Sequence, residues 1–234
     1  MAQLIAVEIP VAHGMLEGLL RLPDSDAGVA GVPTSPARMA AVVCHPLPIG
    51  GGTMHTKAVF RIAQALGEIG MPVLRFNFRG VGRSTGSFDE GRGEADDVRA
   101  ALDELARRYP GVTLCLAGFS FGSKVGLPVG CADPRVRQLI GVGVPVSLLS
   151  VDALAGCSDH KLIVQGAQDE YGPLAELEDW FEHIPAPKEL VVVPEADHFF
   201  TRQQPQLLDA IAGYFRSGAS ALGPLGSSGA VPQH

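Results

Sequence analysis

Charged residues and long apolar runs are both scarce in this chain of 234 residues. Asp, Glu, Lys and Arg together make up 18% of the sequence, whereas hydrophobic residues make up 46%. Disordered chains show the opposite balance, so the composition predicts a globular protein with a substantial core. The longest apolar segment, 139–149, is far shorter than the ~20 residues that span a bilayer, so no membrane partner is expected.

The sequence also lacks an excess of positive charge. It has 18 Lys and Arg against 25 Asp and Glu, which gives a formal net charge of -7. The basic residues are scattered among acids and form no cluster that could follow a phosphate backbone, so a nucleic-acid partner is not expected. The first ten residues lack the basic start and the long apolar stretch of a secretory signal, which favours a cytoplasmic location.

Cysteine is rare, and its spacing indicates no special chemistry. Cys44, Cys115, Cys131 and Cys157 are too far apart in sequence to form a redox motif or a zinc knuckle. Cys44 and Cys115 stand inside apolar runs, where a free thiol behaves as a small hydrophobic group. No two His or Cys residues show ligand spacing on a predicted helix or hairpin, so a metal enzyme is not expected. No cofactor is expected either.

Short apolar runs alternate with helical patterns along the chain. The runs are apolar at consecutive positions, as in parallel strands buried on both faces, and they occupy 40–44, 72–78, 112–117, 139–144, 162–164 and 190–193. Apolar residues at helical spacing fall within 59–66, 98–105, 174–184 and 207–215. This order predicts an α/β fold, a mostly parallel central sheet flanked by helices. The first twenty or so residues, with Gly14 and Gly18 between apolar stretches, predict an antiparallel hairpin.

One domain accounts for most of the sequence. We expect a single domain over 1–217 and a flexible tail over 218–234, where Gly, Ser and Pro dominate. The segment Asp24–Arg38 has a similar composition and is predicted to be a surface loop.

The strand at 112–117 runs directly into Gly118-Phe119-Ser120-Phe121-Gly122. A G-x-S-x-G sequence between a buried strand and a helix is a nucleophile elbow, in which a sharp turn exposes the serine hydroxyl. Glycines two residues before and after the serine let neighbouring backbone pass closely. Ser120 is therefore the candidate nucleophile. Pro128 falls about two turns into the helix and is expected to kink or end it.

An acid and a base follow two further strands. Asp169 comes after the strand at 162–164, and His198 comes after the strand at 190–193. Carboxyl ends of parallel strands share one edge of a sheet, so these loops can meet the serine there. A serine hydroxyl needs such a base to remove its proton. For the acid, Glu170 and Asp197 remain alternatives to Asp169.

The remaining histidines are weaker candidates. His13, His160, His183 and His234 stand in no pattern that supplies a partner and are expected at the surface. His45 and His55 flank a loop rich in Pro and Gly that follows the strand at 40–44. In folds with such an elbow, that loop supplies one donor of an oxyanion hole, and the residue after the nucleophile supplies the other. Because prolines cannot donate, the backbone N–H groups of Leu47 and Phe121 are the candidates; a rigid loop without catalytic contact is the alternative.

Several segments of the chain together resemble a known family, and the combination is more specific than any single motif. The chain resembles the α/β-hydrolase superfamily, and more closely its small, lidless bacterial members related to dienelactone hydrolases. The segments that carry the resemblance are His45–Lys57, Leu74–Gly86, Phe88–Asp97, Gly118–Gly122, Gly166–Asp169 and Ala196–Phe200. Dienelactone hydrolases use a cysteine nucleophile, whereas this chain has Ser120. The HGGG sequence of lipases is absent, and His45-Pro46 stands in its place. The interval between 144 and 162 leaves no room for a helical cap.

The resemblance implies a serine hydrolase that acts on small carboxylic esters or thioesters through an acyl-enzyme. The alternative is a catalytically silent scaffold of the same fold that binds a ligand or partner. Gly80-Val81-Gly82-Arg83 also follows a strand, but its glycine spacing does not match a dinucleotide loop and no acid ends a strand about twenty residues on. Arg79 and Arg83 are expected to anchor this loop or to pair with Asp96 and Asp97.

Overall fold

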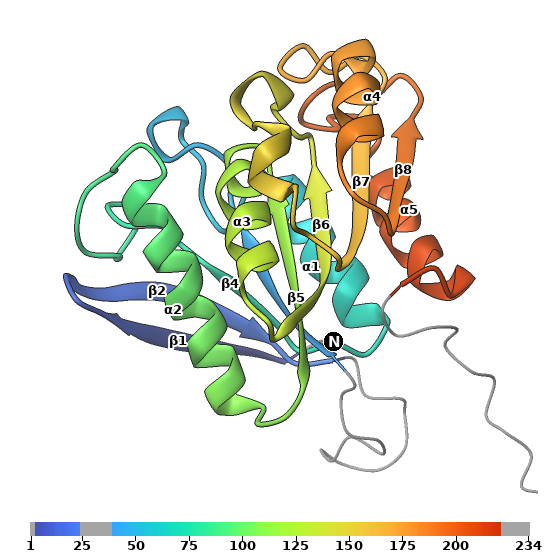
Figure 1. Ribbon diagram of the computed structural model, residues 1–234. Helices are drawn as coiled ribbons and strands as arrows, with labels where there is room; N and C mark the ends of the chain where they lie inside the picture. Colours follow the sequence, from blue (N-terminus) through green and yellow to red (C-terminus); the bar gives the residue numbers. More distant parts are fainter. Residues whose placement is uncertain (1–2, 24–38, 221–234) are drawn as a thin grey trace, which may run out of the picture.

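Residues 3–23 and 39–220 are described by the computed structural model, and they form an eight-stranded sheet with helices on both faces (Figure 1). The strands are β1 (Leu4–Val11), β2 (Gly14–Arg21), β3 (Met39–Cys44), β4 (Val73–Phe76), β5 (Thr113–Phe119), β6 (Val136–Val142), β7 (His160–Gly166) and β8 (Lys188–Val193). The helices are α1 (Lys57–Glu68), α2 (Arg92–Arg108), α3 (Phe121–Ala132), α4 (Leu174–His183) and α5 (Gln204–Ser217). The predicted surface loop at 24–38 and the tail from 221 onward lie outside the described residues.

The sheet has the strand order β1-β2-β4-β3-β5-β6-β7-β8. The β1–β2 and β2–β4 pairs are antiparallel, and the pairs from β4 to β8 are parallel. The predicted α/β class, the mostly parallel sheet and the antiparallel N-terminal hairpin are therefore confirmed.

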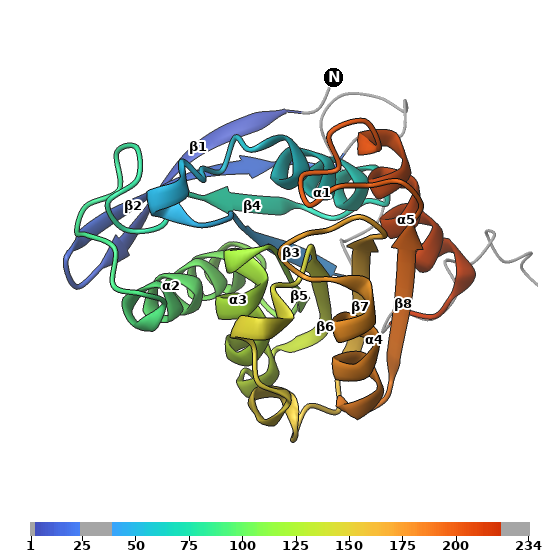
Figure 2. The same ribbon diagram turned by 90° about the horizontal axis from the view of Figure 1, so that it is seen from above.

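Burial explains why the apolar runs form parallel strands that are covered on both faces of the sheet. Every residue of β3 and β4 is buried, as expected for strands that are covered on both faces. The helices bury one stripe each, and in α1 this stripe contains Val59, Ile62, Ala63 and Leu66, which are the residues at predicted helical spacing. Helices α1 and α5 cover one face of the sheet, and α2, α3 and α4 cover the other (Figure 2).

Helix α3 differs from the prediction made for Pro128. The helix continues through Pro128 to Ala132, so the expectation that the proline ends it is wrong. Proline removes one backbone hydrogen bond, but Val125, Leu127 and Val129 are buried in the core on this side of the sheet. Burial of such side chains contributes roughly 1.5–3 kcal/mol each, enough to offset the lost bond.

The carboxyl ends of the parallel strands lie at one edge of the sheet, which Figure 2 views from above. The segment between β6 and β7 at this edge holds two short 3₁₀ helices, Val146–Leu148 and Val151–Leu154, instead of a cap domain. The loops that follow β5, β7 and β8 contain Ser120, Asp169 and His198. The fold thus brings the three predicted catalytic residues to the same edge.

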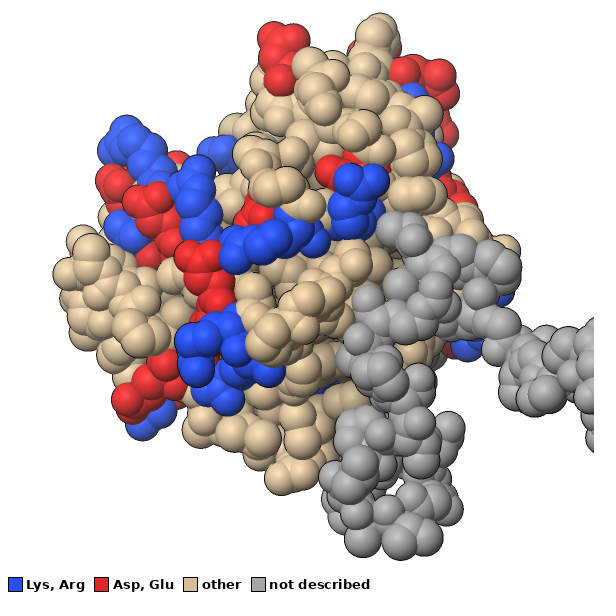
Figure 3. All heavy atoms as spheres, turned by 60° about the horizontal axis from the view of Figure 1, so that its bottom comes forward, with Lys and Arg blue, Asp and Glu red and all other residues tan. Residues whose placement is uncertain are grey.

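The opposite edge carries paired charges. On the face in Figure 3, Lys and Arg side chains lie among Asp and Glu. At the end of α2, Arg108 donates to Glu104, and just before β6 Arg135 pairs with Asp133. Such pairing leaves no continuous basic strip on this face for a polyanion. Across the described parts of the chain, no helix has the length and apolar character needed to cross a bilayer.

Candidate active site

Ser120 occupies the turn between β5 and α3 in a conformation that disfavours side chains. Its φ is 54° and its ψ is -120°, a region normally populated by glycine. The turn is held in place because the backbone N–H of Ser120 donates to the carbonyl of Val142 over 2.9 Å, and its own carbonyl accepts from Oγ of Ser123 over 2.6 Å. The side chain is therefore presented from a rigid support.

The two glycines that flank the serine are required by close backbone contacts. A Cβ on Gly118 would overlap the carbonyl oxygen of Gly122, and a Cβ on Gly122 would overlap that of Cys44. The second contact also brings the loop after β3 against the elbow, since Cys44 pairs with Gly118 in the sheet. The G-x-S-x-G pattern is thus explained by sterics at both positions.

One imidazole joins the serine to the acid. Nε2 of His198 lies 2.9 Å from Oγ of Ser120, and Nδ1 of the same ring lies 2.8 Å from Oδ2 and 3.0 Å from Oδ1 of Asp169. His198 and Asp169 are 3% and 4% exposed, while Ser120 is half-buried. Only the serine end of the chain of hydrogen bonds is open to a substrate.

The Asp169 carboxylate is held by three further donors. Its Oδ1 accepts from the backbone N–H groups of Tyr171 (2.8 Å) and Gly172 (3.0 Å), and its Oδ2 accepts from Nε2 of Gln165 (2.9 Å). Both oxygens are thereby aimed at the imidazole, because every other direction around the carboxylate is occupied by a donor.

Gln165 is a member of the site that the sequence did not reveal. It is fully buried in β7, and besides its bond to Asp169 it donates to the carbonyl of Gly172 (2.8 Å) and accepts from the N–H of Val144 (2.9 Å). The available signal was a single amide inside an otherwise apolar run, four residues before the acid. A polar residue there must find partners in the fold.

The two alternative acids are excluded by their positions. Asp197 accepts a hydrogen bond from the backbone N–H of Thr201 over 2.8 Å, and Glu170 is exposed. Neither contacts His198 through a hydrogen bond within the described residues, so Asp169 is the acid that the structure brings to the imidazole.

The loop after β3 is organised by His45, which is buried. Its Nδ1 lies 2.6 Å from the carbonyl oxygen of Pro46, and its Nε2 accepts from the backbone N–H of Phe78 over 3.0 Å. Pro46 C=O and Leu47 N–H belong to the same planar peptide, so the contact to Pro46 also fixes the direction of the Leu47 N–H. Burial lowers the pKa of His45 from 6.5 to about 4.

The two predicted oxyanion donors lie on adjoining segments. Phe121 is the first residue of α3, and Leu47 precedes the short 3₁₀ helix Pro48–Gly50 in the neighbouring loop. Within residues 3–23 and 39–220, neither backbone N–H donates to a protein acceptor. Donors at the start of a helix favour negative charge, which suits them to an oxyanion.

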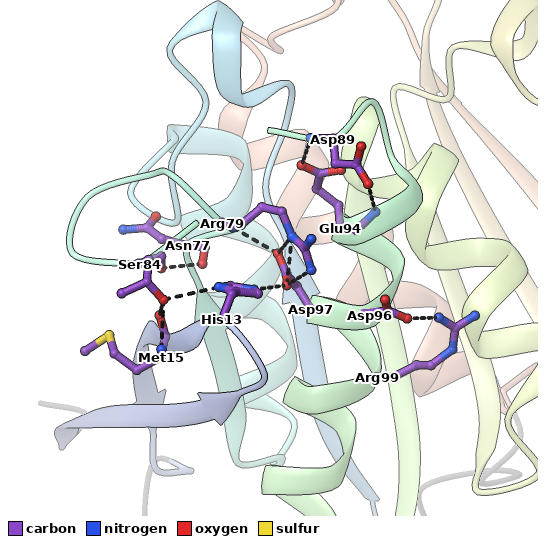
Figure 4. A network of polar contacts seen from close by, with 12 residues as sticks. His13, Met15, Asn77, Arg79, Ser84, Asp89, Glu94, Asp96, Asp97 and Arg99 are labelled. Atoms are coloured by element: carbon purple, nitrogen blue, oxygen red, sulfur yellow. Dashed lines mark hydrogen bonds and ion pairs between the residues drawn. The ribbon is translucent and has the colours of Figure 1, made fainter. Parts of the chain in front are cut away.

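A second polar network lies at the same edge, at the tip of the β1–β2 hairpin (Figure 4). Nη2 of Arg79 binds Oδ1 of buried Asp97 over 2.7 Å, which confirms the predicted pairing of these two residues. His13, which the sequence placed at the surface without a partner pattern, is partly buried and lies 3.2 Å from both Asp97 and Thr85. Hydrogen bonds to its ring come from segments distant in sequence, which local pattern could not reveal.

The other expected pairs in this network are formed differently. Arg83 binds Glu17 of β2 instead of either aspartate, and Asp96 binds Arg99 one turn further along α2. A cleft of about 530 Å³ beside the network is lined by the hairpin tip with His13 and by charged residues of α2 and of the segment before it: Arg79, Asp96, Asp97, Arg99 and Asp103. The acids and bases of this cleft are paired. They are therefore less available to bind a ligand than the open hydroxyl of Ser120 is. No group of His, Cys, Asp or Glu that could hold a metal occurs in the described part of the chain.

Two family models and a curated relative match this chain. A family model described as serine aminopeptidase, S33, matches residues 36–149, and one described as PhoPQ-activated pathogenicity-related protein matches 120–222. An uncharacterized protein of Rickettsia prowazekii is 32% identical over 190 residues, which cover 77% of this chain and 80% of that protein.

Solved structures extend the match over almost the whole chain. An α/β serine hydrolase without a lid from Xanthomonas campestris is 36% identical with a TM-score of 0.83, covering 92% of this chain and 94% of its own. An α/β serine hydrolase homologue from Coxiella burnetii is 35% identical with a TM-score of 0.80, covering 89% and 96%. The chain therefore belongs to the α/β-hydrolase superfamily, and its family and fold are those of a serine hydrolase without a lid.

Proposed function

We propose that this protein hydrolyses small carboxylic esters or thioesters through an acyl-enzyme, with Ser120 as nucleophile, His198 as base and Asp169 as the acid that orients the base. The observation that carries the proposal is the position of one imidazole, whose Nε2 is 2.9 Å from the serine Oγ while its Nδ1 is 2.8 Å from the aspartate Oδ2. In this geometry the tautomer with a proton on Nδ1 leaves Nε2 free to accept the serine proton.

The first half of the reaction forms the acyl-enzyme. Oγ of Ser120 attacks the carbonyl carbon of the substrate while Nε2 of His198 takes the hydroxyl proton, and Asp169 stabilises the resulting imidazolium. The backbone N–H groups of Leu47 and Phe121 hold the negative oxygen of the tetrahedral intermediate. When this intermediate collapses, the bond to the leaving group breaks and His198 gives its proton to the departing oxygen or sulfur.

The second half releases the acid. A water molecule attacks the acyl carbonyl while His198 removes one of its protons, and the proton then returns to Oγ of Ser120 as the ester bond breaks. The chemistry requires no group beyond these side chains, two backbone donors and water. The absence of a cap leaves the serine open to solvent, which suits small, freely diffusing substrates.

Labelling with a fluorophosphonate probe tests the proposal directly. The probe phosphonylates an activated serine with loss of fluoride, so mapping the adduct by mass spectrometry should identify Ser120. Ser120→Ala should abolish labelling and strongly reduce hydrolysis of p-nitrophenyl acetate. We expect the loss of turnover to be about 10⁴-fold or more. Labelling at another serine, or unchanged turnover in Ser120→Ala, would contradict the assignment.

A further inference from the structure

Exposed apolar side chains are concentrated around the candidate active site. Among the described residues, seven large apolar side chains are exposed, and five of them lie on loops at the carboxyl edge of the sheet: Leu47, Ile49, Leu148, Tyr171 and Phe199. Single exposed apolar residues are normal on a protein surface, whereas a group of them marks a binding site. We call these five residues the apolar rim.

Three members of the apolar rim lie on the side of the imidazole. The ring centroid of Tyr171 is 4.6 Å from that of His198, and the ring centroid of Phe199 is 5.1 Å from it. Leu148 belongs to the segment that starts at Val144, and a Cβ on Gly172 would overlap the Val144 carbonyl, so this segment adjoins the Tyr171 loop. Leu47 and Ile49 lie on the opposite side of the serine, on the loop after β3, because β3 adjoins β5 on the side away from β6 and β7.

The chemistry of acyl transfer assigns the two sides to different parts of a substrate. The leaving group receives its proton from Nε2 of His198, so its oxygen or sulfur must come within hydrogen-bonding distance of that atom. The substituent on the leaving group is therefore in contact with the rings of Tyr171 and Phe199, which border the imidazole. Tyr171 is 56% exposed and Phe199 is 49% exposed, so both rings have free surface to offer.

The loop stretches that hold the apolar rim carry no cation for an anionic leaving group, and exposed Arg202 lies beyond Phe199 on the loop after β8. Neither Lys nor Arg occurs within 45–56, 143–150, 167–173 or 194–200, whereas acids occur at Asp169, Glu170, Glu195 and Asp197. A leaving group that bears phosphate or carboxylate would meet like charge beside the imidazole, which opposes its binding.

We propose that the leaving group of the substrate is an uncharged alcohol with a large apolar, ring-bearing substituent that packs against Tyr171 and Phe199, an inference that rests on the proposed function. Aromatic rings in contact stabilise one another beyond simple burial. Because the leaving group departs in the first half of the reaction, this preference acts on the formation of the acyl-enzyme and leaves its hydrolysis unchanged.

Two acetates with the same acyl group provide the test. Benzyl acetate and 2-methoxyethyl acetate release alcohols of similar acidity, so the ratio of their kcat/KM values reports recognition of the leaving group. We expect the wild-type ratio to favour benzyl acetate about tenfold, as for a modest apolar contact in an open site. Tyr171→Ala and Phe199→Ala should each lower the ratio, and the double variant should bring it close to one. Leu4→Ala, which removes an exposed apolar side chain of β1 (51% exposed), is the matched control and should leave the ratio unchanged.

The ratio of the two kcat/KM values distinguishes recognition of the leaving group from displacement of the His198 imidazole. If Tyr171 and Phe199 served only to position the imidazole, their removal would slow both esters by the same factor and the ratio would not change. A wild-type ratio near one, or an unchanged ratio in the double variant, would overturn the inference. If the probe labels Ser120 but benzyl acetate is not cleaved, the inference also fails, whereas the failure of labelling at Ser120 would remove the proposed function itself.

Discussion

The backbone N–H of Phe78 donates a hydrogen bond to Nε2 of His45 over 3.0 Å, and this contact defines the state of the imidazole. Because Nε2 accepts, the ring proton resides on Nδ1, where it is donated to the carbonyl of Pro46 over 2.6 Å. A neutral ring thus satisfies both partners, while a protonated ring would oppose the N–H of Phe78. The loop that carries Leu47 is tied to the end of β4 through a side chain that must stay uncharged.

Replacing His45 should reveal whether this tie serves catalysis. His45→Leu loses the donor to Pro46, so the Leu47 N–H loses its fixed direction, and kcat for an acetate ester should fall about 10²-fold, as on removal of an oxyanion donor. His45→Asn retains an N–H near the position of Nδ1 and should lose less than about tenfold. Both variants leave the Phe78 N–H without its ring acceptor, so an equal loss of kcat in the two would contradict the role assigned to Pro46.

The stability of the protein should depend on pH through the same histidine. Burial lowers the pKa of His45 from 6.5 in the unfolded chain to about 4 in the folded one. Between these values the unfolded chain binds a proton that the folded chain excludes, so the free energy of unfolding falls as the pH is lowered from 6.5 toward 4, by about 3 kcal/mol in all. Urea denaturation at pH 7 and pH 5 measures the change in the free energy of unfolding between these pH values, and this change should be smaller in His45→Asn than in the wild type. An equal change in the free energy of unfolding in both proteins would show that His45 is not the cause of the pH dependence.

Replacement of two carboxylates, one at a time, should distinguish the proposed acid Asp169 from its alternative Asp197. In Asp169→Asn the amide can no longer accept from Nδ1 of His198 in the same way, so the ring loses its productive tautomer and kcat should fall by about 10⁴-fold. Asp197→Asn changes a carboxylate that accepts hydrogen bonds from Thr201 and from the backbone N–H of Phe199, and its kcat should stay within about threefold of the wild type. Comparable losses in both variants would show that the two acids cannot be distinguished in this way.

Two glycines of the loop after β3 offer a steric test of the oxyanion assignment. A Cβ on Gly52 would overlap the carbonyl of Pro46, whereas a Cβ on Gly50 would lie 3.7 Å from Cβ of Leu47 in ordinary contact. Gly52→Ala should therefore shift the Pro46–Leu47 peptide and lower kcat by about tenfold or more, and Gly50→Ala should be close to the wild type. Steady-state kinetics of both variants with one ester would decide the point, and a fully active Gly52→Ala would contradict it.

The parts of the site that sequence could predict are those with a local signal. Ser120 stands between glycines at the end of an apolar strand, and Asp169 and His198 follow the ends of two others, so their meeting at one edge follows from the parallel order of the strands. Helix stripes were predictable for the same reason, because the spacing in α1 and α2 depends on the period of a helix alone.

The parts that could not be predicted depend on register and on contacts between distant segments. Gln165 shows no motif of its own, and its role requires knowing that Val144 and Gly172 lie beside it. The pairing of Arg83 with Glu17 depends on how the hairpin seats against the loop after β4. Pro128 contradicts a rule that holds for isolated helices, because packing on the sheet outweighs the hydrogen bond that it removes.

The conformation of Ser120 should lower the stability of the folded state. A serine at φ 54° and ψ -120° is strained by roughly 1–3 kcal/mol, and glycine adopts this conformation without that strain. Ser120→Gly should therefore be more stable than Ser120→Ala, with a midpoint of thermal unfolding higher by several degrees. Both variants lack the hydroxyl, so calorimetry of the pair isolates the backbone contribution. Equal midpoints would mean that the elbow is not strained.

Under the proposed function, this strain means that selection for folding and selection for reactivity oppose one another at a single residue. A descendant released from its chemical task could gain thermal resistance by one substitution at position 120, with the glycines at 118 and 122 still fitting their neighbours. Loss of the hydroxyl would then be self-reinforcing, because reversion would require accepting a less stable fold. Inert binding proteins could arise from this architecture without passing through a misfolded intermediate.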